Sequence, residues 1–230
     1  GLIFLGQQEK CNGCVELLSS TDNKLTQFAR TTVRACAYAG TGNVLEIQKM
    51  LRICTGEDSL QQAAAVIGIS VIALGDNIGS TMARRSLDLL LQYGKTSARV
   101  AVPIALALTS VSQPLPELVD TLHRMAHNTD INIVLNSAIA MGILAAGTQN
   151  SRTLNALKQL ETFHKSNPGA VMMFQISEGL CHLGQGLMTL SPTYGDSTLI
   201  HPVALGSLMT LAFASIHTDA LLVKGDPLLL

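Results

Sequence analysis

Short apolar stretches, rich in Ala and Gly, recur at a nearly constant interval along the sequence. Six of them close at positions 6, 40, 75, 111, 147 and 184, so that successive stretches lie 34 to 37 residues apart. A seventh stretch, Val203–Ala214, is expected to begin another unit. This interval is typical of proteins built from stacked helix pairs, in which each unit buries its apolar face against its neighbours. The six stretches read GLIFLG, ACAYAG, SVIALG, LALTSV, GILAAG and GLCHLG.

Each unit contains two helical patterns of different character. The small-residue stretches are apolar on nearly all sides, which indicates helices buried from every direction. Amphipathic, charge-bearing segments alternate with them, and no segment shows the sustained alternation of a strand. The sequence therefore predicts an all-α superhelix of helical hairpins, a single repeat domain over residues 1–230 with about six pairs. The amphipathic segments are Asn43–Cys54, Ser80–Tyr93, Glu117–Ala126 and Arg152–Lys165.

Glycines mark fixed positions in these units. A Gly directly after a helix suits the left-handed C′ position, and the closing residues Gly6, Gly40, Gly75, Gly147 and Gly184 are expected to occupy it. Gly142 and Gly179 lie inside apolar helices, where each costs about 1 kcal/mol relative to Ala. Their recurrence predicts helices whose backbones approach closely. Asn43 and Asn150 are expected to cap the helices that follow them, and Pro114, Pro116 and Pro168 are expected in loops.

Composition excludes several classes of protein. Only 13% of the residues are charged and the formal net charge is −1, so the chain lacks the basic field that nucleic acid or an anionic membrane requires. The long apolar stretches span 11 to 13 residues, whereas a membrane-spanning helix needs about 20. A polytopic membrane fragment stays a remote alternative. The apolar stretches are Ala63–Gly75, Val100–Val111 and Ser137–Gly147.

The ends of the sequence suggest a fragment or a processed product. The chain does not begin with Met, and Gly1–Gly6 lacks the basic region of a signal peptide. Cutting an array of stacked helices exposes apolar faces, so we expect self-association or fraying at the ends, including the tail Leu221–Leu230.

Two small constellations could carry chemistry. Cys11 and Cys14 form a CxxC pair, but zinc sites usually add a second pair, and redox pairs accompany a βαβ pattern. The odd count of five cysteines favours reduced thiols in an intracellular protein. Asp120, His123 and His127 have the spacing of one helix face, yet no HExxH motif is present. We therefore predict no catalytic, cofactor-binding or metal-binding residues. A metal or thiol enzyme that uses Cys11/Cys14 or His123/His127 is kept as the alternative.

Several stretches, taken in order, resemble the proteasome/cyclosome repeat family, and in particular the large ubiquitin-receptor, non-ATPase scaffold subunits of the 26S proteasome base. The resemblance extends from Gly1 to about Leu222. A fragment of the paralogous large repeat subunit of the proteasome, or of the cyclosome, is the alternative within the class. The stretches are Cys36–Leu45, Ile69–Gly79, Val102–Ser112, Asn136–Asn150 and Gly179–Gly186.

This resemblance implies a partial α-α toroid without enzymatic activity or cofactor, located in the cytoplasm and nucleus. It implies contacts with the ATPase ring and docking of ubiquitin, of shuttle receptors with ubiquitin-like domains and of a deubiquitinase. Family docking sites use acidic residues on outer helices, and Glu9 and Glu16 match such positions, whereas Asn12 and Gly13 do not. The short loop Gly56–Ser59 replaces a long charged insertion of the family.

Overall fold

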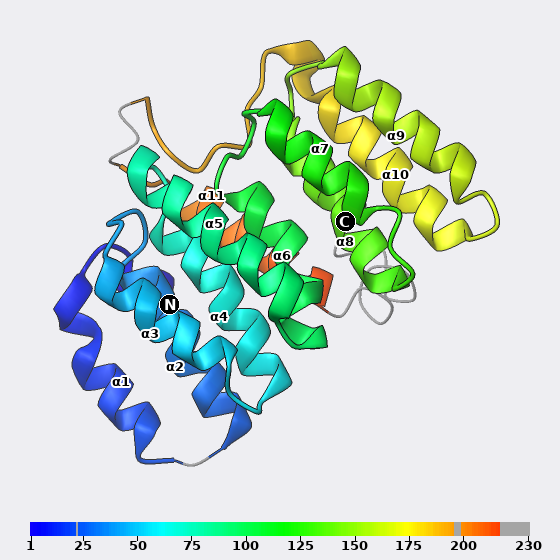
Figure 1. The fold of residues 1–230 in the computed structure, drawn as a ribbon. Coiled ribbons are helices and arrows are strands. Elements are labelled where there is room, and N and C mark those ends of the chain that lie inside the picture. The colour runs from blue at the N-terminus through cyan, green and yellow to red at the C-terminus, as the bar shows by residue number, and fades with distance from the viewer. Residues whose placement is uncertain (22, 196–198, 217–230) are drawn as a thin grey trace.

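The computed structural model describes all residues except 22, 196–198 and 217–230, so the tail Leu221–Leu230 lies outside the described residues. The described residues form helices, and the pairing of Thr193 with Ile200 is the one β-bridge among them. The all-α prediction is therefore confirmed. Ten α-helices of the described part alternate between an outer and an inner row (Figure 1). The outer row is α1 Asn12–Ser19, α3 Val44–Cys54, α5 Asn77–Tyr93, α7 Pro116–Met125 and α9 Ser151–Phe163. The inner row is α2 Lys24–Ala37, α4 Ser59–Ile72, α6 Thr96–Leu108, α8 Ile131–Leu144 and α10 Pro168–Cys181.

The remaining described elements are three short 3₁₀ turns and a last helix. They are η1 Leu2–Phe4, η2 Gln8–Cys11, η3 Leu183–Gly186 and α11 Pro202–Ile216.

Side chains and prolines set the starts of several helices. The Asn43 side chain accepts a hydrogen bond from the Leu45 amide at 3.0 Å, and Asn150 accepts one from the Arg152 amide at 3.0 Å. Both predicted N-caps are confirmed. Pro116 and Pro168 were expected in loops, but each is the first residue of a helix. The first helical position suits proline because its missing amide would have no partner there and its φ is already helical.

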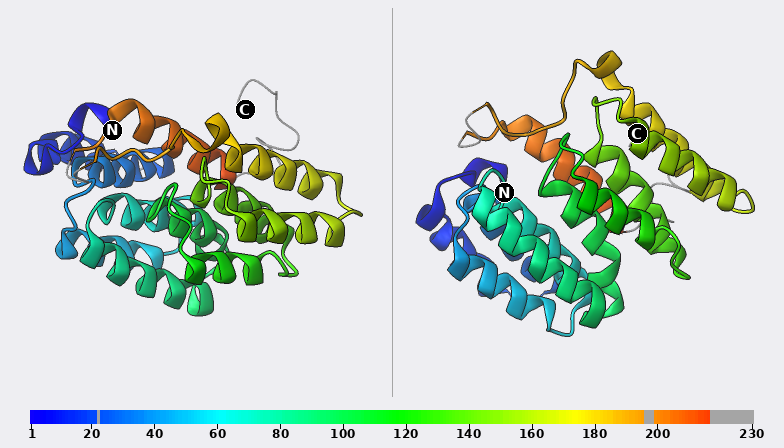
Figure 2. Two further views of the ribbon diagram at one scale, coloured as in Figure 1. Left: turned by 90° about the horizontal axis from the view of Figure 1, so that it is seen from above. Right: turned by 45° about the horizontal axis from the view of Figure 1, so that its top comes forward.

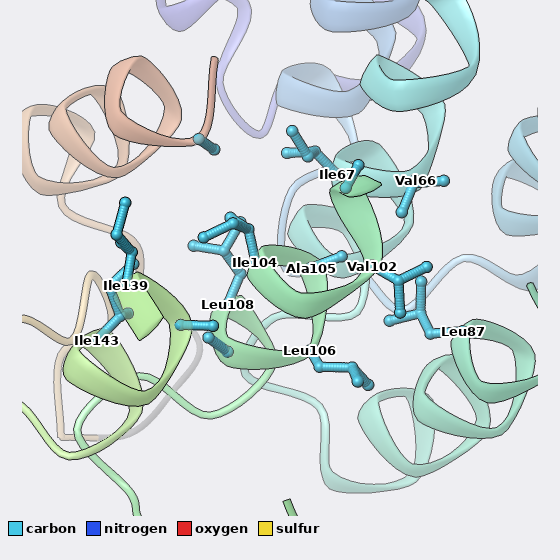
Figure 3. Packing of buried hydrophobic residues seen from close by; sticks show 14 of the residues in the cluster. Val66, Ile67, Leu87, Val102, Ile104, Ala105, Leu106, Leu108, Ile139 and Ile143 are labelled. Atoms are coloured by element: carbon cyan, nitrogen blue, oxygen red, sulfur yellow. The ribbon is translucent and has the colours of Figure 1, made fainter. Parts of the chain in front are cut away.

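The inner helices form the core because they are enclosed on several sides. Successive inner helices pack against one another, and each contacts the outer helix of its own pair. Figure 3 shows Val102 of α6 pointing toward Leu87 of α5, while Ile104 points toward Ile139 of α8. All four side chains are at most 3% exposed. The nearly uniform apolar composition of α4, α6 and α8 follows from this enclosure, whereas α2 at the end of the row is amphipathic.

The turns after α2, α6 and α8 also tie these helices to the next pair. The last carbonyls of a helix lack partners within it. The Gly40 amide, in the turn after α2, donates to the Val71 carbonyl at the end of α4 over 3.0 Å. The same contact recurs from Gly147 to Leu180 at 3.0 Å, and from Ser112 to Ile143 at 3.2 Å. The repeat spacing is therefore also the spacing of a backbone hydrogen bond between neighbouring units.

Helix α11 was expected to begin a seventh unit of the stack, and this expectation is wrong. It contacts α4 and α6 and lies on the face of the inner row opposite the outer helices (Figure 2). The rings of Phe28 in α2 and Phe213 in α11 are 5.6 Å apart, and Cys36 Sγ lies 3.5 Å from Met209 Sδ. The apolar pattern of α11 therefore serves a third layer.

The connection between α10 and α11, which we call the strap (described residues 187–195 and 199–201), explains this return. It runs back along the row of turns in the reverse order of the repeats. The Leu190 amide donates to Ser112 Oγ at 3.0 Å, and Ser191–Thr193 line a small polar cavity of about 60 Å³ together with Gly75. At the far end, Ile200 lies against Gly40.

Candidate partner-binding surface

The outer helices form the surface that a partner would reach. The predicted partner-binding residues lie at its N-terminal edge, where α1 is the first helix of the outer row (Figure 1). Glu9 lies in η2 and Glu16 in α1, and both side chains are exposed. Between them Cys11 is fully buried and fixes this segment on the core, while Leu17 beside Glu16 is 75% exposed. The edge thus presents two carboxylates next to an exposed leucine.

The repeat glycines are left-handed as expected, but the predicted C′ position holds only for Gly6, because the other four lie two residues beyond the helix C-cap. Gly6, Gly40, Gly75, Gly147 and Gly184 all have φ between +55° and +82°. At Gly147 the strap also passes so closely that a Cβ would lie 1.8 Å from the Met188 carbonyl oxygen. A side chain there would be excluded by conformation and by space.

The two helix-interior glycines differ from each other. A Cβ on Gly142 of α8 would lie 2.8 Å from Cα of Ser177 in α10, so these helices do approach closely. Ser177 Oγ donates to the Ala138 carbonyl across the same contact at 2.7 Å. A Cβ on Gly179 would have nothing within 4 Å. The predicted close approach is therefore wrong for Gly179, whose position on α10 is exposed.

The CxxC pair is not arranged for chemistry. Cys11 is fully buried, whereas Cys14 is half-buried, and both are free thiols. Burial raises the pKa of the Cys11 thiol, with a smaller opposing effect of the nearby Arg34. A raised pKa disfavours the thiolate, the reactive form. Within the described residues no three His, Cys, Asp or Glu side chains are grouped as metal ligands.

The predicted shared helix face holds for Asp120 and His123, which lie in α7 and line one groove, but it is wrong for His127, because α7 ends at Met125. The rings of His123 and His127 meet edge to face with centroids 5.1 Å apart, and His127 contacts Phe163 in the same way at 4.9 Å. Desolvation lowers the pKa of His127, as do the neighbouring His123 and His164. Asp120 lines the groove between α7 and α9 together with His123 and pairs with Arg152 of α9 at 2.7 Å.

Sequence reasoning missed an apolar stripe on the exposed face of α5. Ile78, Met82, Leu89 and Tyr93 are 75%, 51%, 59% and 82% exposed. Their separations of four, seven and four residues place them on one side of a helix. The signal was present in the segment Ser80–Tyr93, which carries apolar residues on its outer face as well as its inner one.

Comparison with known proteins gives a consistent result. No family model matches the chain. It is 36% identical over 227 residues to the 26S proteasome non-ATPase regulatory subunit 2 homolog A of Arabidopsis thaliana, covering 97% of the chain and 25% of that protein. The chain is 36% identical over 237 residues to the 26S proteasome regulatory subunit rpn1 of Schizosaccharomyces pombe, and this match covers 100% of the chain and 27% of that protein. It is 38% identical over 223 residues to the 26S proteasome non-ATPase regulatory subunit 2 of Dictyostelium discoideum, and this match covers 96% of the chain and 25% of that protein.

The similarity covers only part of each relative. The chain spans about a quarter of the length of these curated relatives.

Among the described residues, every helix is too short or too polar to cross a membrane.

Proposed function

The chain belongs to the family of the 26S proteasome non-ATPase regulatory subunit 2, of which it matches about a quarter, and we propose that it forms part of the repeat toroid of such a subunit. In this role it is a non-catalytic scaffold in the base of the regulatory particle. The observation that carries the proposal is the homology along nearly the whole chain. The outer helix row supports it, because solenoids bind partners through extended surfaces.

The partners of this role are the ATPase ring subunits, ubiquitin, shuttle receptors with ubiquitin-like domains, and a deubiquitinase. Glu9 and Glu16 are the residues that we assign to docking of a ubiquitin-like domain. Both carboxylates are exposed and Glu16 precedes the exposed Leu17, which suits a partner with basic residues around an apolar patch. The role places the chain in the cytoplasm and nucleus.

A chemical-shift titration tests this assignment. An isotope-labelled ubiquitin-like domain is titrated with the chain and with the double variant Glu9→Lys/Glu16→Lys. We expect progressive shifts with the chain and their loss with the double variant. Glu117→Lys, which reverses an equally exposed charge on α7, is the matched control and should bind as the parent does. Unchanged binding by the double variant would refute the assignment of Glu9 and Glu16 while leaving the scaffold role untouched.

A further inference from the structure

The surface between α3 and α5 differs from the two grooves that follow it in the outer row. Between α7 and α9 most of the lining residues are polar, and the ion pair of Asp120 with Arg152 crosses the groove. Between α5 and α7 the lining includes Asp88, Arg99 and Arg124. Between α3 and α5 lies an apolar groove of about 440 Å³, and no ion pair of the described residues crosses it. Because the units repeat, the α5/α7 and α7/α9 grooves are equivalent in position to the α3/α5 groove, yet charged residues line both of them.

Side chains of both helices form this α3/α5 groove. Leu51 and Cys54 line it from α3, and Leu89, Leu90 and Tyr93 line it from α5. Lys95 closes one end, where its ammonium group donates to the Gly56 carbonyl at 2.7 Å. The α3 and α5 ribbons run side by side over this length (Figures 1 and 2).

The apolar surface continues from the groove along α5. Ile78 and Met82 extend the row of Leu89 and Tyr93 toward the N-terminus of the helix, and all four are more than half exposed. An apolar row of four turns on an exposed helix is the pattern that an amphipathic helical partner covers, with anchors spaced by three, four and seven residues.

Two arginines are the direct sequence neighbours of the groove-lining residues Leu51 and Ser86. Arg52 of α3 and Arg85 of α5 are exposed, and neither forms an ion pair with any described residue. The neighbouring carboxylates are engaged elsewhere. Glu46 is buried and paired with Lys49 at 2.6 Å, and Asp76 caps α5 through the Ile78 and Gly79 amides.

Three further carboxylates lie on these elements. Asp88 lies on the side of α5 that lines the next groove, and Glu57 and Asp58 stand in the loop between α3 and α4. An apolar channel flanked by free guanidinium groups is therefore the complement of an apolar ridge flanked by carboxylates.

We propose that the α3/α5 groove docks an acidic amphipathic helix of a partner protein, with its apolar face on Leu89 and Tyr93 and its carboxylates against Arg52 and Arg85. This surface has the opposite charge to the edge with Glu9 and Glu16, so it takes a different class of partner. The proposal depends only on this groove and not on the proteasomal role.

The test uses a fluorescent synthetic helix of about 18 residues, with Leu at positions i, i+4, i+7 and i+11 and Glu on its flanks. A second peptide replaces every Glu with Lys and keeps the apolar face. Binding to the whole chain is followed by fluorescence anisotropy. We expect the acidic peptide to bind at least about tenfold more tightly than the basic one, with affinity falling as salt is raised.

Four variants locate the site. L89S and the double variant R52E/R85E should each weaken acidic-peptide binding about tenfold. L25S and the double variant K24E/K165E make a matching Leu→Ser change and a matching reversal of two positive charges at exposed positions on α2 and after α9, and should bind as the parent does. All four changes are at exposed positions, so equal denaturation midpoints will show that binding, not folding, has changed.

Several results would overturn the proposal. One is equal affinity for the acidic and basic peptides, and another is unchanged binding by L89S. Sedimentation showing that the chain dimerises and that L89S abolishes the dimer would assign the groove to a second copy. Chemical shifts at Leu89 and Tyr93 on addition of a ubiquitin-like domain would assign it to that partner instead.

Discussion

Replacing Gly142 with Ala tests the close packing of the inner row. The added Cβ would lie 2.8 Å from Cα and 2.9 Å from Cβ of Ser177, which are closer than carbon atoms approach in folded proteins. Because one of these atoms is backbone, a rotamer change cannot relieve the contact. Helices α8 and α10 must move apart, which also stretches the 2.7 Å hydrogen bond from Ser177 Oγ to the Ala138 carbonyl.

The expected effect is a balance of three contributions. Alanine in place of glycine favours a helix by about 1 kcal/mol. Overpacking costs about 1–3 kcal/mol, and weakening a buried hydrogen bond costs about 1 kcal/mol. We therefore expect Gly142→Ala to lower the free energy of unfolding by about 1–3 kcal/mol. For a chain of this size that corresponds to a fall of roughly 2–10 °C in the melting temperature.

Gly179→Ala provides the matched comparison in the neighbouring helix. Its Cβ would have nothing within 4 Å, so only the propensity gain applies and the free energy of unfolding should rise by about 1 kcal/mol. Guanidinium denaturation followed by circular dichroism at the helix band measures both variants against the parent. If both substitutions stabilise the chain, or if both destabilise it equally, the account of packing between α8 and α10 is refuted.

Four further predictions concern other parts of the fold. Gly147→Ala should destabilise the chain by about 3 kcal/mol, because a left-handed φ and the Met188 carbonyl both oppose a side chain; a denaturation midpoint equal to the parent's would contradict this. Asp120→Asn breaks an ion pair whose side chains are 57% and 59% exposed, so the loss should stay below about 1 kcal/mol and vanish in high salt. Glu46→Gln removes a buried carboxylate between Arg34 and Lys49 and should cost about 2 kcal/mol, with no recovery in high salt. Burial raises the pKa of the Cys54 thiol to about 12, whereas the thiol of the unfolded chain has a pKa of about 8.5. The stability that the protonated thiol contributes is therefore complete below the unfolded-state pKa and is lost as the pH rises toward 12. Denaturation midpoints compared at neutral and alkaline pH should show a smaller fall for Cys54→Ala than for the parent.

The local parts of the fold could be predicted because they follow from periodicity and capping. The small-residue stretches predict α4, α6 and α8, and Asn43 and Asn150 predict the starts of the helices that follow them. In each case the residues that carry the signal lie in or next to the helix that they predict. The position of α11 could not be predicted in this way. Its composition matches that of the inner helices, and the contacts that hold it, such as Phe28 with Phe213, join residues far apart in the sequence.

The candidate surfaces were predictable to different degrees. Glu9 and Glu16 were found through family resemblance, and the structure adds that both are exposed on the outer side. The α3/α5 groove was missed because Leu51 and Leu89 belong to different units, and only the stacking of those units brings them together. The exposed apolar row on α5 was the one feature of the local sequence that indicated this groove.

The scaffold role is tested most directly by purifying the protein that carries this chain from its own cells under native conditions. Mass spectrometry then identifies the proteins that accompany it. The account predicts ATPase and other regulatory subunits of the 26S proteasome in stoichiometric amounts. Recovery of the protein alone, or with partners that include no proteasome subunit, would contradict it.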